Sequence, residues 1–266
     1  EARSRRVLER ELRRALDRRE LVLHYQPQLE LGTGRVTGIE ALIRWRHPER
    51  GLVPPVEFIP LAEACGLILR LGVWVLDEAC RQARAWQEAG LELTVAVNLS
   101  AAQLRHGGFL QAIDDTLGRH RLDPARLELE ITESLLLERT ESTTDRTLRG
   151  LAARRIAMAL DDFGVGYSSL AYLKRLPVQK IKIDRSFVRD IGTDPEDEAL
   201  VRAIVTLGHT LGKIVVAEGV ETEQQRNMLR ILGCTEMQGY LFSRPVPDVE
   251  IRRLLSAHRE KAVSVA

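Results

Sequence analysis

The chain has 266 residues, of which 44% are apolar and 29% charged, and its 39 Lys and Arg against 38 Asp and Glu leave a formal net charge of +1. The apolar fraction excludes a disordered chain, and the length corresponds to one large domain or two small ones with a sizeable core. The charge balance argues against a general DNA-binding protein, and no apolar run reaches the roughly 20 residues that span a bilayer.

The N-terminal stretch 5–19 is predicted to form an amphipathic helix with a charged face in water. It is rich in Arg and Glu, and its apolar residues at helical spacing are Leu8, Leu12, Ala15 and Leu16. No signal peptide is predicted, and three widely spaced cysteines are typical of a reduced, cytoplasmic protein. We therefore interpret residues 1–20 as a linker helix, 21–258 as a single domain and 259–266 as a tail.

Short apolar or β-branched runs then alternate with segments of helical periodicity. The helical segments 71–89 and 198–211 are followed by Gly90 and Gly212, and glycine commonly caps the C-terminus of a helix. About eight strands with interleaved helices are expected of a (β/α)8 barrel, whereas the alternative, a doubly wound open sheet, usually needs fewer. The predicted strands are 21–26, 35–45, 93–99, 127–131, 156–160, 180–183, 214–217 and 236–241.

The first two predicted strands depart from a simple barrel. The extended run that begins with the first strand covers residues 21–31, and only Gly32-Thr33-Gly34 separates it from 35–45, whereas a parallel pair needs a crossover of about a dozen residues or more. The short glycine-containing link therefore predicts a hairpin. The expected α/β fold is a modified TIM barrel whose first strand runs antiparallel to the second.

Polar residues recur at the C-terminal ends of the predicted strands, which in a parallel barrel meet at one rim. Taken singly, such residues are usually helix caps or turn formers: capping is the default for Asn98, and a turn is the default for Glu218 before Gly219. Caps do not explain Glu at three separate strand ends. The residues concerned are Gln26, Glu40, Arg44, Asn98, Glu130, Asp161, Asp162, Lys182, Asp184, Glu218 and Gln238.

Six of these residues are carboxylates, and only Lys182 and Arg44 bring positive charge. Two like charges 4 Å apart repel by roughly 4 kcal/mol at an effective dielectric constant near 20, so the cluster must bind either protons or cations. Oxygen ligands without thiolate or His select Mg²⁺ or Mn²⁺. The adjacent Asp161 and Asp162 are suited to a carboxylate shared by two ions, which would activate a water for displacement at phosphorus. The residue types thus predict metal-dependent phosphodiester hydrolysis.

The motifs that contain these residues resemble those of the EAL domains, the phosphodiesterases of cyclic di-GMP. The resemblance covers residues 21–255, and the blocks follow one another in the family's order, which makes the match very specific. The blocks are Tyr25-Gln26-Pro27, Glu40-Ala41-Leu42-Ile43-Arg44-Trp45, Asn98-Leu99-Ser100, Glu130-Ile131-Thr132-Glu133, the run from Asp161-Asp162-Phe163-Gly164 to Leu170, Lys182-Ile183-Asp184, Ala217-Glu218-Gly219-Val220-Glu221, Gln238-Gly239-Tyr240 and Phe242-Ser243-Arg244-Pro245.

The resemblance assigns roles to the predicted site. The residues that it implies for two Mg²⁺ or Mn²⁺ ions are Glu40, Asn98, Glu130, Asp161, Asp162 and Glu218, with Asp161 shared by both ions. The implied catalytic residues are Lys182, Glu218 and Glu40, and the implied substrate-binding residues are Gln26, Arg44, Asp184 and Gln238. Because a Lys acts as a base only when its pKa is depressed, we expect Lys182 to promote water activation through its charge. Arg44 suits a phosphate oxygen.

The resemblance also implies a mobile loop, residues 163–170, after the fifth predicted strand. In the family this loop governs metal occupancy and dimer contacts. Glu133 is expected to anchor it, and Glu221 to support the turn at Glu218. Position 165 is Val where the family most often has Thr, which removes a hydroxyl but no presumed ligand, so we expect tuned rather than lost activity.

The function implied by the resemblance is hydrolysis of cyclic di-GMP to linear 5′-pGpG by a water activated between two ions. The alternative is a receptor that binds cyclic di-GMP without hydrolysing it, although such relatives usually lack a ligand and none is missing here. A third possibility is a fragment that is inactive until an upstream domain or dimer contact orders the loop. The family implies a homodimer and an upstream sensor or GGDEF-type domain, and we expect a cytoplasmic fragment that neither inserts into a membrane nor binds DNA.

Overall fold

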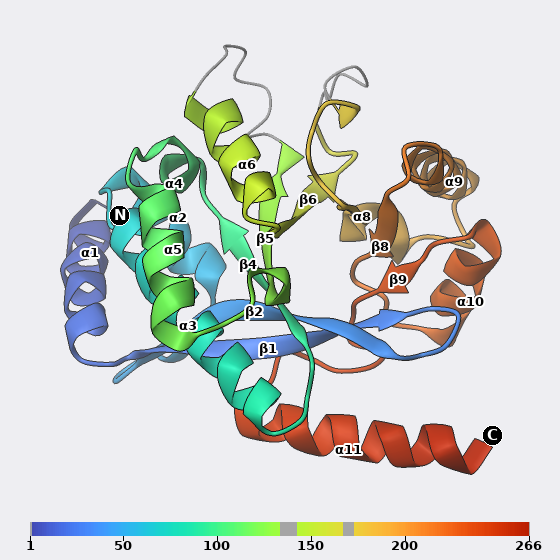
Figure 1. The fold of residues 1–266 in the computed structure, drawn as a ribbon, viewed down its shortest axis with the longest axis horizontal. Helices are drawn as coiled ribbons and strands as arrows, with labels where there is room; N and C mark the ends of the chain where they lie inside the picture. Colours follow the sequence, from blue (N-terminus) through green and yellow to red (C-terminus); the bar gives the residue numbers. More distant parts are fainter. Residues whose placement is uncertain (1, 134–142, 167–172, 266) are drawn as a thin grey trace.

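The computed structural model describes residues 2–133, 143–166 and 173–265, with side chains described between residues 7 and 258 of these ranges. Within them one sheet has the strand order β1-β9-β8-β7-β6-β5-β4-β2-β3, and an additional pairing of β1 with β2 closes it into a barrel (Figure 1). The strands are β1 Leu21–Glu30, β2 Val36–His47, β3 Gly51–Val53, β4 Thr94–Leu99, β5 Leu127–Thr132, β6 Ala157–Phe163, β7 Lys180–Ile183, β8 Ile214–Ala217 and β9 Glu236–Met237.

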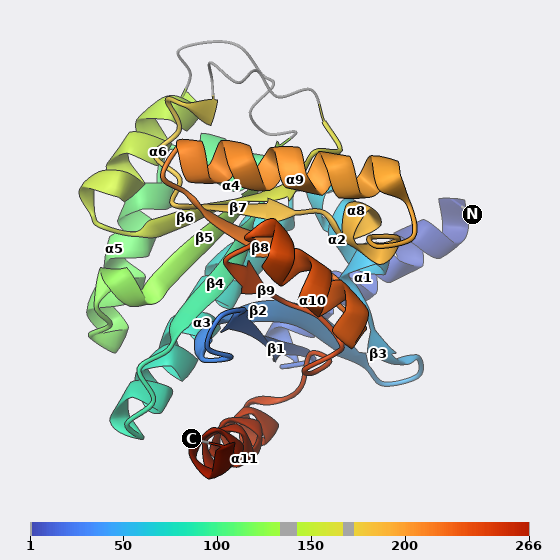
Figure 2. The same cartoon turned by 90° about the vertical axis from the view of Figure 1, so that its right-hand side faces the viewer.

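Helices cover the outside of this barrel. They are α1 Ala2–Asp17, α2 Pro55–Ala64, α3 Ile68–Glu88, α4 Ala101–Arg105, α5 Phe109–His120, the 3-10 turn Pro124–Arg126, α6 Thr143–Ala153, α8 Arg185–Arg189, α9 Pro195–Thr210, α10 Glu223–Leu232 and α11 Asp248–Val265. Figure 2 shows α8, α9 and α10 along the side formed by β7, β8 and β9. Helix α11 lies against β1 (Figure 1), and it runs through the boundary at residue 258 that we predicted for the domain.

The predicted modified barrel is confirmed. Strand β1 pairs antiparallel with β2, and Gln26 lies opposite Glu40 in their register. Strand β2 then pairs in parallel with β4, as do the consecutive strands from β4 to β9. The predicted hairpin therefore supplies the antiparallel step that closes an otherwise parallel sheet. Gly90 and Gly212 follow α3 and α9 with φ values of 77° and 66°, the left-handed conformation expected after a helix.

Two strands differ from the prediction. The short strand β3 pairs antiparallel with the end of β2 and was not predicted, because three residues give no alternating pattern to read. The last predicted strand, 236–241, is reduced to Glu236–Met237. The chain leaves the sheet there because Gly239 packs on the backbone of Val220, where a Cβ at position 239 would lie only 2.0 Å from the Val220 carbonyl oxygen.

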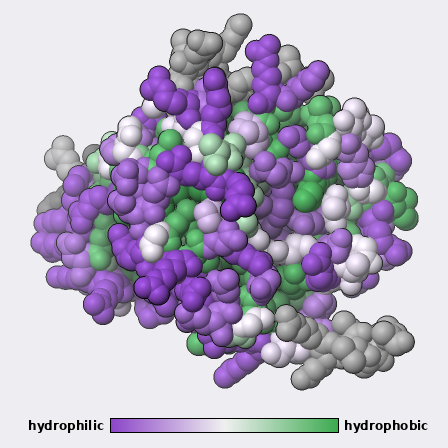
Figure 3. Space-filling model, in the orientation of Figure 1, coloured by the Kyte–Doolittle hydropathy of each residue, from purple (hydrophilic) through white to green (hydrophobic). Residues whose placement is uncertain are grey.

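Two apolar cores hold the helices in place. The larger one packs the outer faces of the strands against the surrounding helices. The smaller one joins α1 to the barrel: Leu12 and Ala15 are fully buried with Trp45 of β2 and Phe58 of α2. The face seen in Figure 3 is covered mainly by hydrophilic side chains, with small hydrophobic areas between them. In the described part of the chain, no helix has both the length and the apolar character needed to cross a membrane.

The inside of the barrel is lined by polar side chains in two layers. Successive residues of a strand face opposite sides, so Glu128 and Glu130 of β5 both point inward, as do Lys180 and Lys182 of β7. Stacked layers of inward side chains are usual in such barrels, but they are normally filled with apolar residues. Here both layers carry charge. The layer of Glu130 and Lys182 forms the site described next.

Candidate active site

Lys182 is the centre of the upper layer and is only 1% exposed. Its Nζ lies 2.7 Å from Glu130 Oε2 and 2.7 Å from Glu218 Oε1. The same atom lies 3.0 Å from Asp161 Oδ1 and 3.8 Å from Glu40 Oε2. Carboxylates from four separate strands or strand ends therefore meet around one ammonium group.

The side of the site formed by β1, β2 and β4 is a chain of hydrogen bonds. Asn98 Nδ2 donates to Glu40 Oε1 over 2.7 Å, and Gln238 Nε2 donates to Glu40 Oε2 over 2.5 Å. Gln238 also donates to Gln26 Oε1, and Gln26 Nε2 donates to the Ser243 carbonyl. Both Glu40 oxygens are thus held in fixed directions by amide donors.

Glu40 and Asn98 do not have the local positions expected from the sequence, which were a strand end for Glu40 and a helix cap for Asn98. Glu40 lies in the middle of β2 rather than at its end. After the parallel pairing with β4 ends at Ala41, β2 continues to His47 by pairing with β1 and then with β3. Asn98 does not cap the following helix. Ser100 does so, in a capping box with Gln103, which leaves the Asn98 amide to Glu40.

Asp161 and Asp162 reach the site through a local distortion of β6. Consecutive strand residues normally point to opposite faces, but the register of β6 against β7 shifts between Leu160 and Phe163, and Asp162 has a φ of 53°. This left-handed conformation is uncommon for a residue other than glycine. It brings carboxylate oxygens of Asp161, Asp162 and Glu218 within 4.8 Å of one another.

The site carries more negative charge than its cations balance. Burial, and then the neighbouring Asp161 carboxylate, raise the pKa of Asp162 to about 6, and burial raises the pKa of Glu218 to about 8. Burial and the Glu40 charge also raise the pKa of Glu130 well above its ordinary value. Protons or cations are therefore favoured at this end of the barrel, as the sequence indicated.

Lys182 is held in its charged form. Burial alone would lower the pKa of its ammonium group, but the charges of Glu130 and Glu218 outweigh burial and raise that pKa well above the usual value. A lysine with a raised pKa is a poor proton acceptor. Its chemistry is therefore that of a fixed positive charge.

The donor set suits hard divalent cations. Carboxylate oxygens predominate, and Asp161 Oδ1 is buried with no hydrogen bond among the described residues, although it lies 3.0 Å from Lys182 Nζ. Such an oxygen is available to a cation. Oxygen-rich sites without sulfur are those that Mg²⁺ and Mn²⁺ occupy, so the residues fit these ions.

Asp184 and Arg44 lie at the edge of the site. Asp184 caps α8 by accepting from the Ser186 N–H and hydroxyl, and it shares a hydrogen bond with Asp162. Arg44 is partly buried, and its guanidinium donates to the Ile43 carbonyl over 2.8 Å. Burial lowers the pKa of Arg44, and Tyr240 and then Glu40 partly offset that effect.

Glu133 forms its contacts through its side-chain carboxylate, whereas Glu221 forms its contact through its backbone. Glu133 Oε2 accepts from the N–H groups of Gly164 and Gly166 over 2.9 and 3.1 Å, which ties the end of β5 to the chain after β6. Residues 167–170 of the predicted loop lie outside the described residues. Glu221 is exposed, and its backbone N–H donates to Gln225 Oε1, so it contributes to the turn through its backbone.

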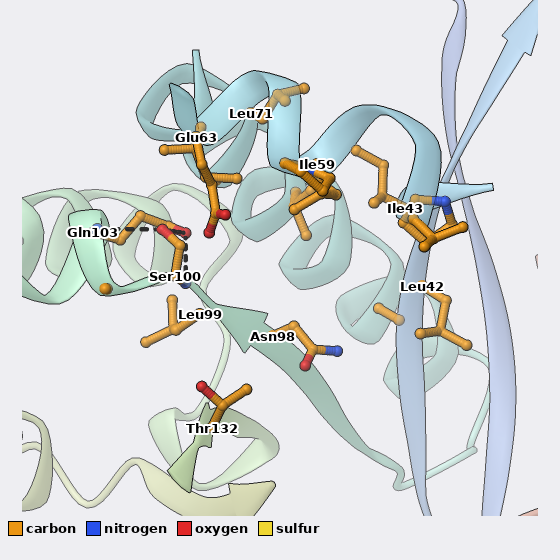
Figure 4. A pocket seen from close by; sticks show the side chains of 18 residues that line it. Leu42, Ile43, Ile59, Glu63, Leu71, Asn98, Leu99, Ser100, Gln103 and Thr132 are labelled. Atoms are coloured by element: carbon orange, nitrogen blue, oxygen red, sulfur yellow. Dashed lines mark hydrogen bonds between the residues drawn. The ribbon is translucent and has the colours of Figure 1, made fainter. Parts of the chain in front are cut away.

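Two hollows border the candidate site. The larger, about 480 Å³, lies between β2, α2, α3 and β4; it is mostly apolar and is bordered by Leu42, Ile59, Glu63 and Asn98. Figure 4 shows Glu63 and Asn98 on different sides of this hollow. The smaller hollow, about 190 Å³, contains Glu40, Glu218, Arg185 and Tyr240 among its lining residues.

Several residues of these hollows were not found by sequence reasoning. Arg185 directly follows Lys182-Ile183-Asp184, so its position was a usable signal. Tyr240 and Arg244 were quoted only as members of motifs: Tyr240 lines the smaller hollow, and the Arg244 guanidinium lies 4.2 Å from the centre of the Tyr240 ring in a cation–π contact. Glu63 lies in α2, outside every motif, and only the folded chain brings it to the larger hollow.

Comparisons of the sequence and of the structure with known proteins agree on one family. The family model "EAL domain" matches residues 9–245. MucR of Pseudomonas aeruginosa, named a bifunctional diguanylate cyclase/cyclic di-GMP phosphodiesterase, is 49% identical over 91% of this chain and 35% of its own length. The signaling protein YkoW of Bacillus subtilis is 43% identical over 92% of this chain and 30% of its own. The chain thus spans about a third of the curated relatives that it matches.

Solved structures share the fold. The MucR phosphodiesterase in complex with c-di-GMP superposes with a TM-score of 0.88 and 49% identity, covering 91% of this chain and 98% of that one. The enzyme Bd1971, with cAMP and cyclic di-GMP bound, gives a TM-score of 0.90 and 33% identity, covering 96% of this chain and 69% of that one.

Proposed function

The chain belongs to the EAL domain family, and from this premise we propose that it hydrolyses cyclic di-GMP to linear 5′-pGpG with two Mg²⁺ or Mn²⁺ ions. The observation that carries the proposal is the ring of Glu40, Glu130, Asp161 and Glu218 around Lys182. This ring carries more negative charge than one ammonium group can balance. Asn98, which donates to Glu40, and Asp162, beside Asp161 and Glu218, are the other two residues proposed as ion ligands.

The proposed ion ligands fall into two groups that share Asp161. One group consists of Glu40, Asn98, Glu130 and Asp161, and the other of Asp161, Asp162 and Glu218. When bound, the ions would supply an activated water and stabilise negative charge on a phosphodiester. The Asp161 oxygen without a hydrogen bond supports a shared ligand at this position.

The other site residues act by holding and charging this arrangement. Lys182 contributes a fixed positive charge that favours the deprotonated form of a nearby water. Asn98 and Gln238 keep the Glu40 carboxylate in one orientation. Arg44 would contact a phosphate oxygen, because its guanidinium lies at the edge of the site and presents paired donors.

The two hollows support a substrate that has two bases joined through phosphodiester linkages. Leu42 borders both hollows, Asn98 borders the larger one, and Glu40 and Glu218 border the smaller one. The larger hollow has apolar walls for a purine face and the Glu63 carboxylate as an acceptor for guanine N–H groups. The smaller one offers the aromatic ring of Tyr240. Gln26, Gln238 and Asp184 would complete the contacts to the nucleotide.

Two further proposals concern the parent protein. We infer an additional sensor or GGDEF-type domain, since MucR carries two named activities and this chain spans only 35% of it. We also infer that Glu133 and the loop after β6 take part in a homodimer contact that adjusts metal occupancy. The parent protein would work in the cytoplasm, where cyclic di-GMP is found.

Product analysis tests the proposed function. The purified chain is incubated with cyclic di-GMP under saturating Mn²⁺, with EDTA, and with a linear dinucleotide or a simple monophosphodiester as competing substrates. We expect 5′-pGpG as the product, no turnover in EDTA, and loss of turnover in Glu40→Ala and Asp161→Ala. Return of the bound cyclic compound intact, by the isolated chain and by the full-length protein, would identify a receptor instead.

A further inference from the structure

A second charged layer lies beneath the proposed ion site, and the proposed chemistry does not use it. Lys180 is its centre: Nζ lies 3.2 Å from Glu128 Oε2 and 3.1 Å from Glu236 Oε2. All three side chains are at least nine-tenths buried. Their neighbours in this layer include Gly38 and Ala159, which leave room for long polar side chains. Buried ions of this kind are costly for folding and therefore call for an explanation.

Gln28 connects this lower layer to the site above it. It is 1% exposed, and its Oε1 accepts from Lys180 Nζ over 3.3 Å while its Nε2 donates to Glu130 Oε1 over 3.4 Å. The other Glu130 oxygen accepts from Lys182. Both oxygens of the Glu130 carboxylate, a proposed ion ligand, thus accept hydrogen bonds, one from Lys182 in the upper layer and one from Gln28 below it.

The direction of the Gln28 amide is fixed by Lys180. An ammonium group can only donate, so the amide oxygen must face Lys180, and the amide nitrogen is then turned toward Glu130. Gly38 contributes space, because a Cβ there would lie 3.1 Å from Gln28 Oε1. Without the charge of Lys180, the amide would lose the contact that sets its orientation.

We propose that Lys180 and Gln28 are positioning residues for the ion site: Lys180 orients the Gln28 amide, and Gln28 holds the Glu130 carboxylate in place to receive a divalent cation. The inference rests on the proposed function, because it assumes that Glu130 is an ion ligand. Neither residue touches the substrate. Outer contacts that orient an ion ligand typically change metal affinity or activity by about 10–100-fold when they are removed.

The test measures Mn²⁺ affinity by titration calorimetry on the purified chain without substrate. Gln28→Met replaces the amide with an apolar side chain of similar volume. We expect this variant to bind Mn²⁺ about tenfold more weakly. Lys180→Met alone would leave two buried carboxylates unpaired and could unfold the chain. The second variant therefore combines Lys180→Met with Glu128→Gln and Glu236→Gln, and the same weakening is expected because the Gln28 amide loses its orienting partner.

Ile181→Ala is the matched control. Ile181 is fully buried on the same strand but packs outward near Gly208 of α9, so its truncation should lower the melting temperature without changing Mn²⁺ affinity.

Wild-type Mn²⁺ affinity in the Gln28 variant, or a loss of affinity no larger than that of Ile181→Ala, would overturn the inference. A loss in the Gln28 variant alone would overturn the part assigned to Lys180. No Mn²⁺ binding by the wild type would instead contradict the proposed function, and the inference with it.

Discussion

The ammonium group of Lys182 lies among four carboxylates in a position almost closed to water. A buried charge is stable only when it is paired, and removing one partner typically costs about 3–5 kcal/mol. Lys182 therefore has two effects that are separable by experiment. It stabilises the carboxylates in the absence of metal, and it supplies charge next to the proposed reaction.

Lys182→Met is expected to lower the rate of cyclic di-GMP hydrolysis about 10²–10³-fold, the usual cost of removing one electrostatic group from an active site. It is also expected to lower the melting temperature in EDTA, with recovery when Mn²⁺ is added, because the ions replace the missing charge. Both are measured on one preparation by initial rates and thermal unfolding. The control is Lys213→Met, whose ammonium donates to the Val178 carbonyl away from the site; equal losses in both variants would contradict the role of Lys182.

At the scale of elements, Glu133 joins the ends of two neighbouring strands. It directly follows β5, and its carboxylate accepts from the backbone at Gly164 and Gly166 just after β6. Strand β6 carries Asp161 and Asp162 directly before its last residue, Phe163. The contact therefore restrains the segment that presents two of the proposed ion ligands.

Glu133→Ala is expected to weaken Mn²⁺-dependent turnover about 10–100-fold, because the restraint on the chain after Asp162 is lost. Glu133→Gln keeps an amide oxygen that can accept the same N–H groups, so it should retain a larger share of the activity. Initial rates across a series of Mn²⁺ concentrations make the comparison. Equal activity in the wild type and both variants would show that the segment needs no such anchor.

Helix α1 is packed as part of the barrel rather than as a free connector. Leu12 and Ala15 are fully buried against the group that contains Trp45 and Phe58. The amphipathic pattern predicted the helix and its inner face. The pattern did not reveal that this face packs against β2 and α2. Helical periodicity shows which side of a helix is buried, but not which other element covers that side.

Leu12→Ala is expected to lower the free energy of unfolding by about 2–5 kcal/mol, the usual cost of truncating a buried leucine. Chemical denaturation measures this change. Arg10→Ala, on the exposed face of the same helix, is the control and should change stability by less than about 0.5 kcal/mol. If the two variants were equally stable, α1 would not contribute to the folded core.

At the scale of the whole molecule, the proposed ion site lies at the mouth of the barrel, and its ligands come from β2, β4, β5 and β6 and from the end of β8. Ions that bind only the folded chain stabilise it by about 2.7 kcal/mol at a concentration 100 times the dissociation constant. Mn²⁺ is therefore expected to raise the melting temperature, and EDTA to reverse the change. Thermal scans over a series of Mn²⁺ concentrations check this, and an unchanged melting temperature at all of them would contradict the proposed ion site.

The sequence predicted the fold, and it predicted which polar side chains lie together, because both depend on strand order. Alternating segments predicted the barrel, the three-residue glycine link predicted the antiparallel first strand, and polar strand ends predicted residues that meet at one rim. What remained hidden depends on contacts across the barrel. Glu128 and Lys180 each lie two residues before a predicted site residue, so alternation placed them on the inner face, but nothing local indicated that Gln28 joins them to Glu130.

The central claim, that acidic side chains from separate strands form one two-ion site at the mouth of the barrel, is tested most directly by anomalous diffraction from crystals grown with Mn²⁺. The account predicts two anomalous peaks per chain, one bounded by Glu40, Asn98, Glu130 and Asp161 and the other by Asp161, Asp162 and Glu218. Fully occupied Mn²⁺ elsewhere, with neither peak among these carboxylates, would contradict it.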